Sequence, residues 1–177
     1  MTLPDVETLL RSKVRDIPDY PEPGVVFRDI TPMLADPLAF TAVVDTIVSR
    51  HGRGTVDKVV GVEARGFIIG APVAYHFGAG FVPVRKVGKL PHETFEQAYE
   101  LEYGKATLEI HQDALAPGER VLIVDDVLAT GGTAAAAVEL VRRTGADVVG
   151  ASFLIELEFL HGRRQLPGVD VDALLRY

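Results

Sequence analysis

The chain has 177 residues, of which 47% are hydrophobic, and it carries a net charge of -7. This length suits one domain with a sizeable core, and an acidic chain lacks the broad positive surface of proteins that bind duplex nucleic acid. The sequence has no cysteine, which excludes disulfides and thiolate metal sites. No segment has the apolar length of a membrane span or the apolar core of a secretory signal, so we expect a cytoplasmic protein without nucleic-acid or membrane partners.

Helical and strand patterns alternate along the chain. Apolar residues at helical spacing predict a helix over residues 4–17, and a turn-rich stretch follows at residues 19–24. Asp36 is a typical N-cap and Pro37 a typical first helical residue, so they predict the start of a second helix. The pattern then predicts, in order, a strand at 58–62, a helix at 66–77, strands at 80–84 and 120–124, a helix at 132–143 and a strand at 148–155.

This alternation predicts an α/β fold, with a mainly parallel central sheet covered by helices on both faces. Ligands of such sheets bind at the carboxyl ends of the strands. Residues 86–106 do not fit the alternation, because they are polar and their dense apolar positions are aromatic. A segment of this length is often a mobile functional loop. The chain has no internal repeat and no interdomain linker, so we expect one domain over residues 1–177.

The most informative segment is the stretch from Val121 to Thr133. Glycines in it let backbone N–H groups turn toward an anion, and the start of the next predicted helix adds partial positive charge. A predicted buried strand ends at two adjacent carboxylates, Asp125 and Asp126, and a turn of small and hydroxyl residues follows: Ala129, Thr130, Gly131, Gly132 and Thr133.

Two carboxylates beside this turn would repel a lone phosphate. The pattern therefore favours a ligand with hydroxyl groups at one end and a phosphate at the other, such as a ribose 5-phosphate whose hydroxyls donate to the carboxylates. The alternative is a structural strand–turn–helix whose threonines only cap the helix. A P-loop is not indicated, because no lysine follows the glycines.

The stretch VLIVDDVLATGGT resembles the phosphoribosyl pyrophosphate-binding motif of the type I phosphoribosyltransferases. Four further segments are similar, in the same order, to segments of the adenine-specific members of that family: PGVVFRDITP (23–32), GVEARGF (61–67), VRKVGKLP (84–91) and LEYGKATLEIHQDAL (101–115). The resemblance covers residues 19 to about 157. It implies the type I phosphoribosyltransferase fold, with an N-terminal hood over about residues 1–35 and a flexible catalytic loop over about residues 86–106.

The activity that this resemblance implies is transfer of the 5-phosphoribosyl group from phosphoribosyl pyrophosphate to adenine. The products would be adenosine monophosphate (AMP) and pyrophosphate, in a purine salvage reaction. The resemblance also implies a homodimer and Mg²⁺ as the cofactor. Asp125, Asp126 and the turn at 129–133 would then bind the ribose phosphate, while Glu63 and Ala64 would belong to a pyrophosphate loop with a cis peptide bond between them.

Four charged residues take catalytic roles by the same resemblance: Arg65, Arg85, Lys89 and Glu102. Taken alone, Arg65 would fit a surface ion pair, and the basic cluster of Arg85, Lys86 and Lys89 would fit a solvated strand edge. In the family, these positions reach pyrophosphate, in some members across the dimer interface. Glu102 is implied to lie near the base, where it helps to manage the purine proton during transfer.

The remaining implied residues are Val26, Phe27 and Arg28, which would bind the base. The histidines show no ligand spacing, so no metal site built by the protein is predicted, and Mg²⁺ is expected mainly on pyrophosphate and waters. Two alternatives stay open. One is a phosphoribosyltransferase for another purine such as hypoxanthine or xanthine, because the ribose-phosphate motif does not select the base. The other is a non-enzymatic, nucleotide-sensing regulator of the same fold.

Overall fold

A computed structural model describes residues 5–100 and 104–177, which are built around one mixed sheet. Its strand order is β5-β6-β4-β3-β7-β8-β9. Pairing is parallel from β4 through β3, β7 and β8 to β9, whereas β6 pairs antiparallel with both β4 and β5. The strands span Lys58–Val62 (β3), Gly80–Lys86 (β4), Thr94–Glu100 (β5), Lys105–His111 (β6), Arg120–Leu128 (β7), Asp147–Glu156 (β8) and Val171–Arg176 (β9).

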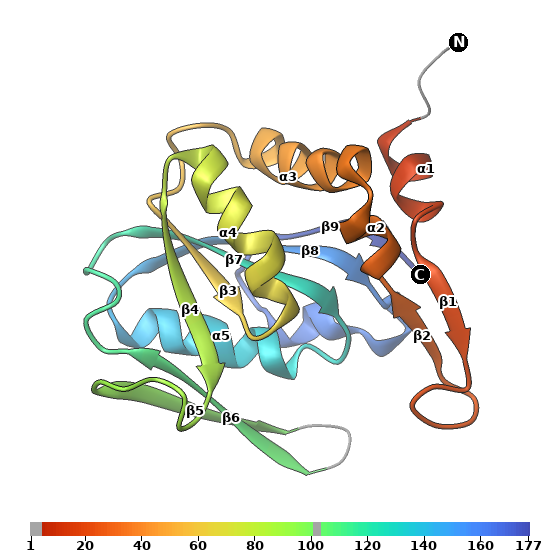
Figure 1. Ribbon diagram of the computed structural model, residues 1–177. Helices are drawn as coiled ribbons and strands as arrows, with labels where there is room; N and C mark the ends of the chain where they lie inside the picture. The colour runs from red at the N-terminus through yellow and green to blue at the C-terminus, as the bar shows by residue number, and fades with distance from the viewer. Residues whose placement is uncertain (1–4, 101–103) are drawn as a thin grey trace.

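Helices cover both faces of this sheet (Figure 1). On one face lie α3 (Pro37–His51) and α4 (Arg65–Phe77), and on the other lies α5 (Gly132–Arg143). Side chains of a strand point alternately to the two faces. Val60 and Val62 of β3 therefore belong to the apolar core under α5, while Val59 between them belongs to the core under α3 and α4. The predicted α/β fold with a mainly parallel sheet is confirmed.

The described part of the hood contains α1 (Val6–Arg11), β1 (Arg15–Pro18), β2 (Val26–Asp29) and α2 (Thr31–Ala35). The helix predicted over residues 4–17 is wrong in its second half, because the chain after residue 14 is extended. There β1 pairs antiparallel with β2, with Ile17 opposite Phe27. Apolar spacing within the first 17 residues carries no signal for a strand partner that lies further along the chain.

Other predicted boundaries hold more closely. Asp36 caps α3 as predicted, because its carboxylate accepts hydrogen bonds of 3.0 Å from the amides of Leu38 and Ala39. The helix at 132–143 has the predicted bounds. In contrast, the strand predicted to end at residue 124 continues to Leu128, because β8 pairs alongside it to that point.

Residues 86–106 also differ from the prediction. Where the sequence predicts a loop, the described residues include β5 and the start of β6, which pair antiparallel from Thr94 opposite His111 to Glu100 opposite Lys105. The strands of this hairpin contain alternating polar residues, so they lack the apolar runs from which the other strands were predicted. Two short 3-10 helices, η1 (Glu158–Leu160) and η2 (Gly162–Gln165), and strand β9 follow in the C-terminal part, where the apolar pattern predicts no element.

The helices of residues 5–100 and 104–177 are either too short or too polar to cross a bilayer.

Candidate active site

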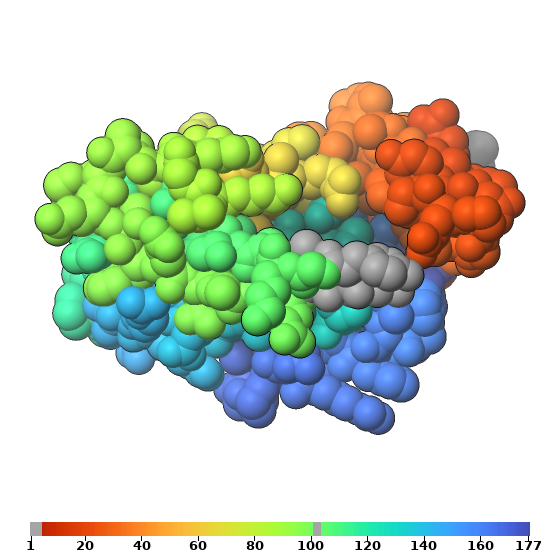
Figure 2. Space-filling view, turned by 90° about the horizontal axis from the view of Figure 1, so that it is seen from below, coloured from red at the N-terminus to blue at the C-terminus, as the bar shows by residue number. Residues whose placement is uncertain are grey.

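A cavity of about 500 Å³ opens between the hood and the carboxyl ends of β3 and β7. In Figure 2, the red-orange hood and the green β5–β6 hairpin stand on opposite sides of a hollow, with yellow and teal residues between them. The cavity brings together residues from distant parts of the sequence. The predicted site residues that line it are Val26, Phe27, Arg28, Glu63, Ala64, Arg65, Asp125, Asp126, Ala129 and Thr133.

The two adjacent carboxylates reach the cavity because β7 is longer than its neighbour β3. Pairing between these strands ends at Gly61 opposite Val124, whereas β7 continues beside β8. Asp125 and Asp126 therefore directly follow the last residue of β7 that pairs with β3. The first turn of α4 packs directly against them, since a Cβ at Gly66 would lie 2.8 Å from Oδ1 of Asp125. A glycine at this position lets α4 approach so closely.

The two carboxylates have different electrostatic partners. Asp126 forms an ion pair with Arg65, and its backbone amide donates a 2.9 Å hydrogen bond to Oδ1 of Asp125. Burial and then the neighbouring charge of Asp126 raise the pKa of Asp125 well above its usual value, and the positive charge of Arg65 only partly opposes this shift. Burial and the negative charge of Asp126 thus disfavour the charged form of Asp125, and a nearby cation or set of donors would favour it.

The turn at 129–133 forms a second, smaller cavity of about 50 Å³ beside the first. Gly131 adopts a φ of 88° at the N-cap of α5, which is a left-handed conformation suited to glycine. Its N-cap has no side-chain hydrogen bond among the described residues, so the first amides of α5 are available to an anion. Thr130, Gly131 and Gly132 line this smaller cavity together with Ala129 and Thr133.

The C-terminal part of the chain supports this turn from behind, which the sequence did not predict. A Cβ at Gly131 would collide with the carbonyl oxygen of Gly162 in η2, and a Cβ at Gly162 would collide with the carbonyl oxygen of Ala129. Two glycines that face each other thus let the backbones of the turn and η2 pack in direct contact. The conformation of the turn at 129–133 thus depends on a segment about 30 residues further along the chain.

Glu63 connects the cavity to the basic cluster. The Glu63–Ala64 peptide is cis, as the resemblance implied. The Glu63 carboxylate accepts hydrogen bonds from Nε of Arg85 (3.3 Å) and the amide of Lys86 (3.1 Å), and it forms an ion pair with Lys89. Arg85 and Lys89 do not line the cavity themselves, but both contact a residue that does.

The groups around Glu63 lower its pKa and so favour the ionised carboxylate. Burial acts to raise the pKa of Glu63, but the hydrogen bonds from Lys89, the Lys86 amide and Arg85 together lower it. In the unliganded protein, the Glu63 carboxylate is thus a hydrogen-bond or ion-pair partner of all three basic residues of this cluster. An incoming polyanion would have to replace Glu63 as their partner.

Glu109 was missed by the sequence analysis. This buried residue of β6 accepts hydrogen bonds from the amides of Lys89 (2.8 Å) and Leu90 (2.7 Å), which fixes the turn that carries Lys89. Burial acts to raise the pKa of Glu109, but hydrogen bonds from three successive amides lower it. In the sequence, Glu109 is a carboxylate between two apolar residues, which could have marked it as buried. The turn amides that it binds could not be inferred.

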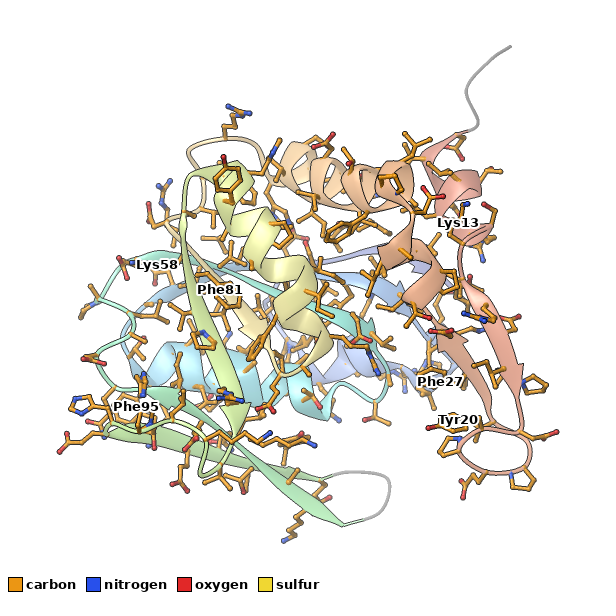
Figure 3. The ribbon with its side chains drawn as sticks, viewed as in Figure 1. Lys13, Tyr20, Phe27, Lys58, Phe81 and Phe95 are labelled. Atoms are coloured by element: carbon orange, nitrogen blue, oxygen red, sulfur yellow. The ribbon has the colours of Figure 1, made fainter. Side chains whose placement is uncertain are left out.

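Aromatic contacts shape the side of the cavity formed by the hood. Phe27 and Tyr20 lie beside each other near the connection between β1 and β2, with ring centroids 5.3 Å apart (Figure 3). The guanidinium of Arg65 lies 5.7 Å from the centre of the Phe27 ring. Arg65 therefore lies between the carboxylates of β7 and the hood, at a distance from Phe27 where a cation–π attraction is still felt.

Lys86 of the basic cluster also lines the cavity, and five further residues line it without having been predicted as site residues: Val25, Tyr99, Leu108, Val127 and Leu157. Leu157 directly follows β8, so the rule that ligands bind at carboxyl strand ends could have identified it. Tyr99 comes from β5, whose place beside the cavity depends on the antiparallel hairpin. Glu102 lies outside the described residues.

Comparisons with known proteins agree on one family. A family model described as a phosphoribosyl transferase domain matches residues 33–167. The chain is 64% identical to an adenine phosphoribosyltransferase of Acidothermus cellulolyticus over 97% of each chain, and 59% identical to one of Streptomyces coelicolor over 96% of each.

Solved structures give the same result. The fold is similar to crystal structures of adenine phosphoribosyltransferases from Rhodothermus marinus, with a TM-score of 0.92 and 50% identity, and from Saccharomyces cerevisiae, with a TM-score of 0.91 and 40% identity. The alignment covers 97% of this chain and 98% of the first structure, and 96% and 98% for the second. The yeast structure is a complex with an imino-altritol bisphosphate and adenine.

Proposed function

The chain belongs to the phosphoribosyltransferase family, among its adenine phosphoribosyltransferases, and we propose that the cavity between the hood and the carboxyl ends of β3 and β7 is its active site. The enzyme transfers the 5-phosphoribosyl group from phosphoribosyl pyrophosphate to adenine and gives AMP and pyrophosphate. The observation that carries the site is the convergence of Asp125, Asp126, the turn at 129–133 and the hood on one cavity.

The ribose phosphate is proposed to lie along the end of β7 and the start of α5. Asp125 and Asp126 would accept hydrogen bonds from the ribose hydroxyls, and the amides of the 129–133 turn would donate to the 5-phosphate. The anomeric carbon gains positive character as the bond to pyrophosphate breaks. Adjacent carboxylates favour such a charge, which gives Asp125 and Asp126 a second role in the transition state.

Pyrophosphate is proposed to bind where Arg65, Arg85 and Lys89 approach the cavity. In the unliganded protein, Arg65 is paired with Asp126, while Arg85 and Lys89 are paired with Glu63. These carboxylates hold the cations close to where the leaving group develops charge. Replacing a carboxylate by pyrophosphate then requires small side-chain movements, and the cations stabilise the departing anion.

Mg²⁺ fits this arrangement as a cofactor. It prefers phosphate oxygens, waters and a small number of carboxylates, and Asp125 and Asp126 offer carboxylates beside the proposed ribose site. When bound with the substrate, it would neutralise pyrophosphate charge. Burial and the charge of Asp126 raise the pKa of Asp125, and cations that arrive with the substrate would favour its ionised form.

Adenine is proposed to bind against β2. The backbone carbonyl of Val26 would accept from the 6-amino group and the amide of Arg28 would donate to N1, while Phe27 contributes an aromatic wall. Glu102 is proposed to manage the purine proton. The test of the whole assignment is a steady-state assay with phosphoribosyl pyrophosphate, Mg²⁺ and adenine. Release of pyrophosphate that depends on adenine supports it, and the absence of release would contradict it.

Closure of the segment at 86–106 over the substrates gives a further prediction. Water must be excluded, because hydrolysis of the substrate competes with transfer. We expect trypsin to cleave first after Lys86, Lys89 or Lys105 in the unliganded enzyme, and we expect substrates to protect these bonds. The measurement is the rate of each cleavage by mass spectrometry, with cleavage after Arg142 in α5 as the internal control. Equal cleavage rates at the three lysines with and without substrates would argue against a closing segment.

A homodimer with shared active sites is also proposed. Its support on the surface is a set of exposed apolar side chains on α4 and just after β4: Ile68 (46% exposed), Tyr75 (87%) and Val87 (48%). We expect a dimer in analytical ultracentrifugation. If Arg85 acts in the partner's site, a heterodimer of an Arg85→Ala subunit and an Asp125→Asn subunit contains one complete site.

The complementation experiment has two distinct outcomes. Shared sites predict about half of the wild-type activity in the purified heterodimer, since one of two sites is intact, whereas each mutant homodimer has both sites impaired. Activity no higher than that of the two homodimers would confine Arg85 to its own subunit, in agreement with its hydrogen bond to Glu63 in the same chain.

A further inference from the structure

The hood sheet has no strand neighbour to fix its position. Among the described residues, β1 and β2 pair only with each other, and the seven-stranded sheet is separate. A two-stranded sheet is marginally stable by itself. The place of β2 over the cavity must therefore depend on side-chain contacts with the rest of the protein, and these contacts control the geometry of any ligand that β2 holds.

Tyr177 supplies such a contact. Its ring centre lies 4.1 Å from the Cζ atom of Arg28 in β2 and 4.7 Å from that of Arg11 in α1. Both distances are well inside the range of a cation–π interaction. Arg28 is also paired with Asp16 in β1, so the same guanidinium connects both strands of the hood sheet to the ring.

Tyr177 is itself firmly attached to the core. Its amide donates a 3.0 Å hydrogen bond to the carbonyl of Glu156, and its carbonyl accepts one of 2.9 Å from the amide of Glu158. These bonds tie it to the end of β8, and Figure 1 shows this end of the chain beside the hood. These two bonds use backbone atoms and are kept when the side chain is changed, whereas the packing of the ring against the core under α3 and α4 is lost in Tyr177→Ala and kept in Tyr177→Phe.

The contact has a direct consequence for the cavity. The Arg28 side chain is 21% exposed and is held between Asp16 and the Tyr177 ring. Contacts that hold this side chain in place also restrict the backbone of β2. This matters for the cavity because Val26, Phe27 and Arg28 of β2 line it. The ring of Tyr177 does not line the cavity itself, so it can act on a ligand only through β2.

We propose that Tyr177 is a positioning residue for adenine, holding β2 in register over the cavity through its ring contact with Arg28. This rests on the proposed base site at Val26 and Arg28. Among the described residues, the backbone hydrogen bonds and cation–π contacts of Tyr177 involve Glu156, Glu158, Arg11 and Arg28, and none of these is proposed to bind phosphoribosyl pyrophosphate. Loss of the ring should therefore weaken the use of adenine and leave the use of the other substrate unchanged.

The first test is a split between the two KM values. A cation–π contact of about 0.5–2 kcal/mol corresponds to a change of roughly 2-fold to 30-fold at about 1.4 kcal/mol per tenfold. Tyr177→Ala should raise KM for adenine by that factor, with KM for phosphoribosyl pyrophosphate within about twofold of wild type. Tyr177→Phe keeps the ring and should behave as wild type. A rise of both KM values would overturn the proposal. A smaller amount of folded enzyme lowers only the apparent kcat and leaves both KM values unchanged, so it cannot imitate the expected split.

The second test is a double-mutant cycle with Arg28→Ala. If the ring acts through this guanidinium, Tyr177→Ala should have little further effect on KM for adenine in the Arg28→Ala background. Independent, additive effects of the two substitutions would overturn the proposal.

The third test does not depend on the activity. Hydrogen exchange of peptides that cover β1 and β2, measured without substrates, should be faster in Tyr177→Ala than in wild type and unchanged in Tyr177→Phe. Unchanged exchange would overturn the proposed anchor. Faster exchange with an unchanged KM for adenine would show an anchored hood that does not position the base, which also overturns the proposal. If the wild type does not use adenine at all, the proposed function is wrong. Hydrogen exchange would still show whether Tyr177 holds β1 and β2 in place, because it is measured without substrates.

Discussion

The wild-type enzyme should use adenine at least about 30-fold more efficiently than hypoxanthine, as measured by kcat/KM at saturating phosphoribosyl pyrophosphate. Hypoxanthine has a carbonyl at position 6 and a hydrogen on N1, so it reverses both proposed contacts with the backbone of Val26 and Arg28. Each mismatched buried contact costs roughly 1–3 kcal/mol. Two of them give about 2–6 kcal/mol, which is a preference of roughly 30-fold to 10⁴-fold.

The control for this prediction is Arg28→Ala. Because the proposed contacts are made by backbone groups, the variant should weaken binding of adenine while it keeps the preference over hypoxanthine. The structure gives a reason for the weakening, since the variant loses both the Asp16 ion pair and the contact with Tyr177. If wild-type enzyme used hypoxanthine within a few-fold of adenine, the proposed base contacts would be wrong, although the ribose-phosphate site would still stand.

Asp125→Asn and Asp126→Asn should each lower kcat/KM by roughly 10-fold to 140-fold. Both substitutions keep the shape of the side chain and remove its charge. Each lost charge-assisted hydrogen bond costs about 1.5–3 kcal/mol, which is the stated range at about 1.4 kcal/mol per tenfold. Asp113→Asn is a matched control, because Asp113 is exposed and lies away from the cavity. Wild-type efficiency in both site variants would reject the ribose assignment.

Asp125→Asn should raise the stability of the unliganded protein, although it lowers kcat/KM. The pKa of Asp125 is raised in the folded protein, so ionisation of this group destabilises the fold as the pH rises above the pKa of an unfolded aspartate. Asp125→Asn lacks this ionisation. The free energy of unfolding of the unliganded variant should therefore exceed that of wild type at pH 7, and the difference should shrink as the pH falls toward 4. A variant less stable than wild type at pH 7 would contradict this account.

These two expectations for Asp125 reflect one physical cause. A site that must hold hydroxyls and a developing positive charge places carboxylates where they are poorly solvated before the substrate binds. Asp126 has Arg65 as its ion-pair partner in the unliganded protein. For Asp125, an amide hydrogen bond and the charge of Arg65 do not offset burial and the neighbouring negative charge. Stability and activity are therefore expected to change in opposite directions at Asp125.

The proposed ribose-phosphate site could be predicted from the order of the residues alone. Asp125, Asp126 and the turn at 129–133 are consecutive, and a turn between a strand and a helix is formed by local interactions that the order of residues encodes directly. The Asp36 cap and the bounds of the helix at 132–143 were predictable for the same reason. Similarity of short segments then added the family, the cis peptide at Glu63 and the place of the basic residues.

The way in which these segments come together could not be predicted from the sequence. The hood strands, the β5–β6 hairpin and β9 depend on pairing between segments, and apolar spacing within one segment carries no signal for its partner. The pairing of Glu63 with Arg85 and Lys89, the support of Gly131 by Gly162 and the contact of Tyr177 with Arg28 each join residues at least 20 positions apart. Such contacts arise when the chain closes on itself, because packing then selects among partners that the local sequence treats as equivalent.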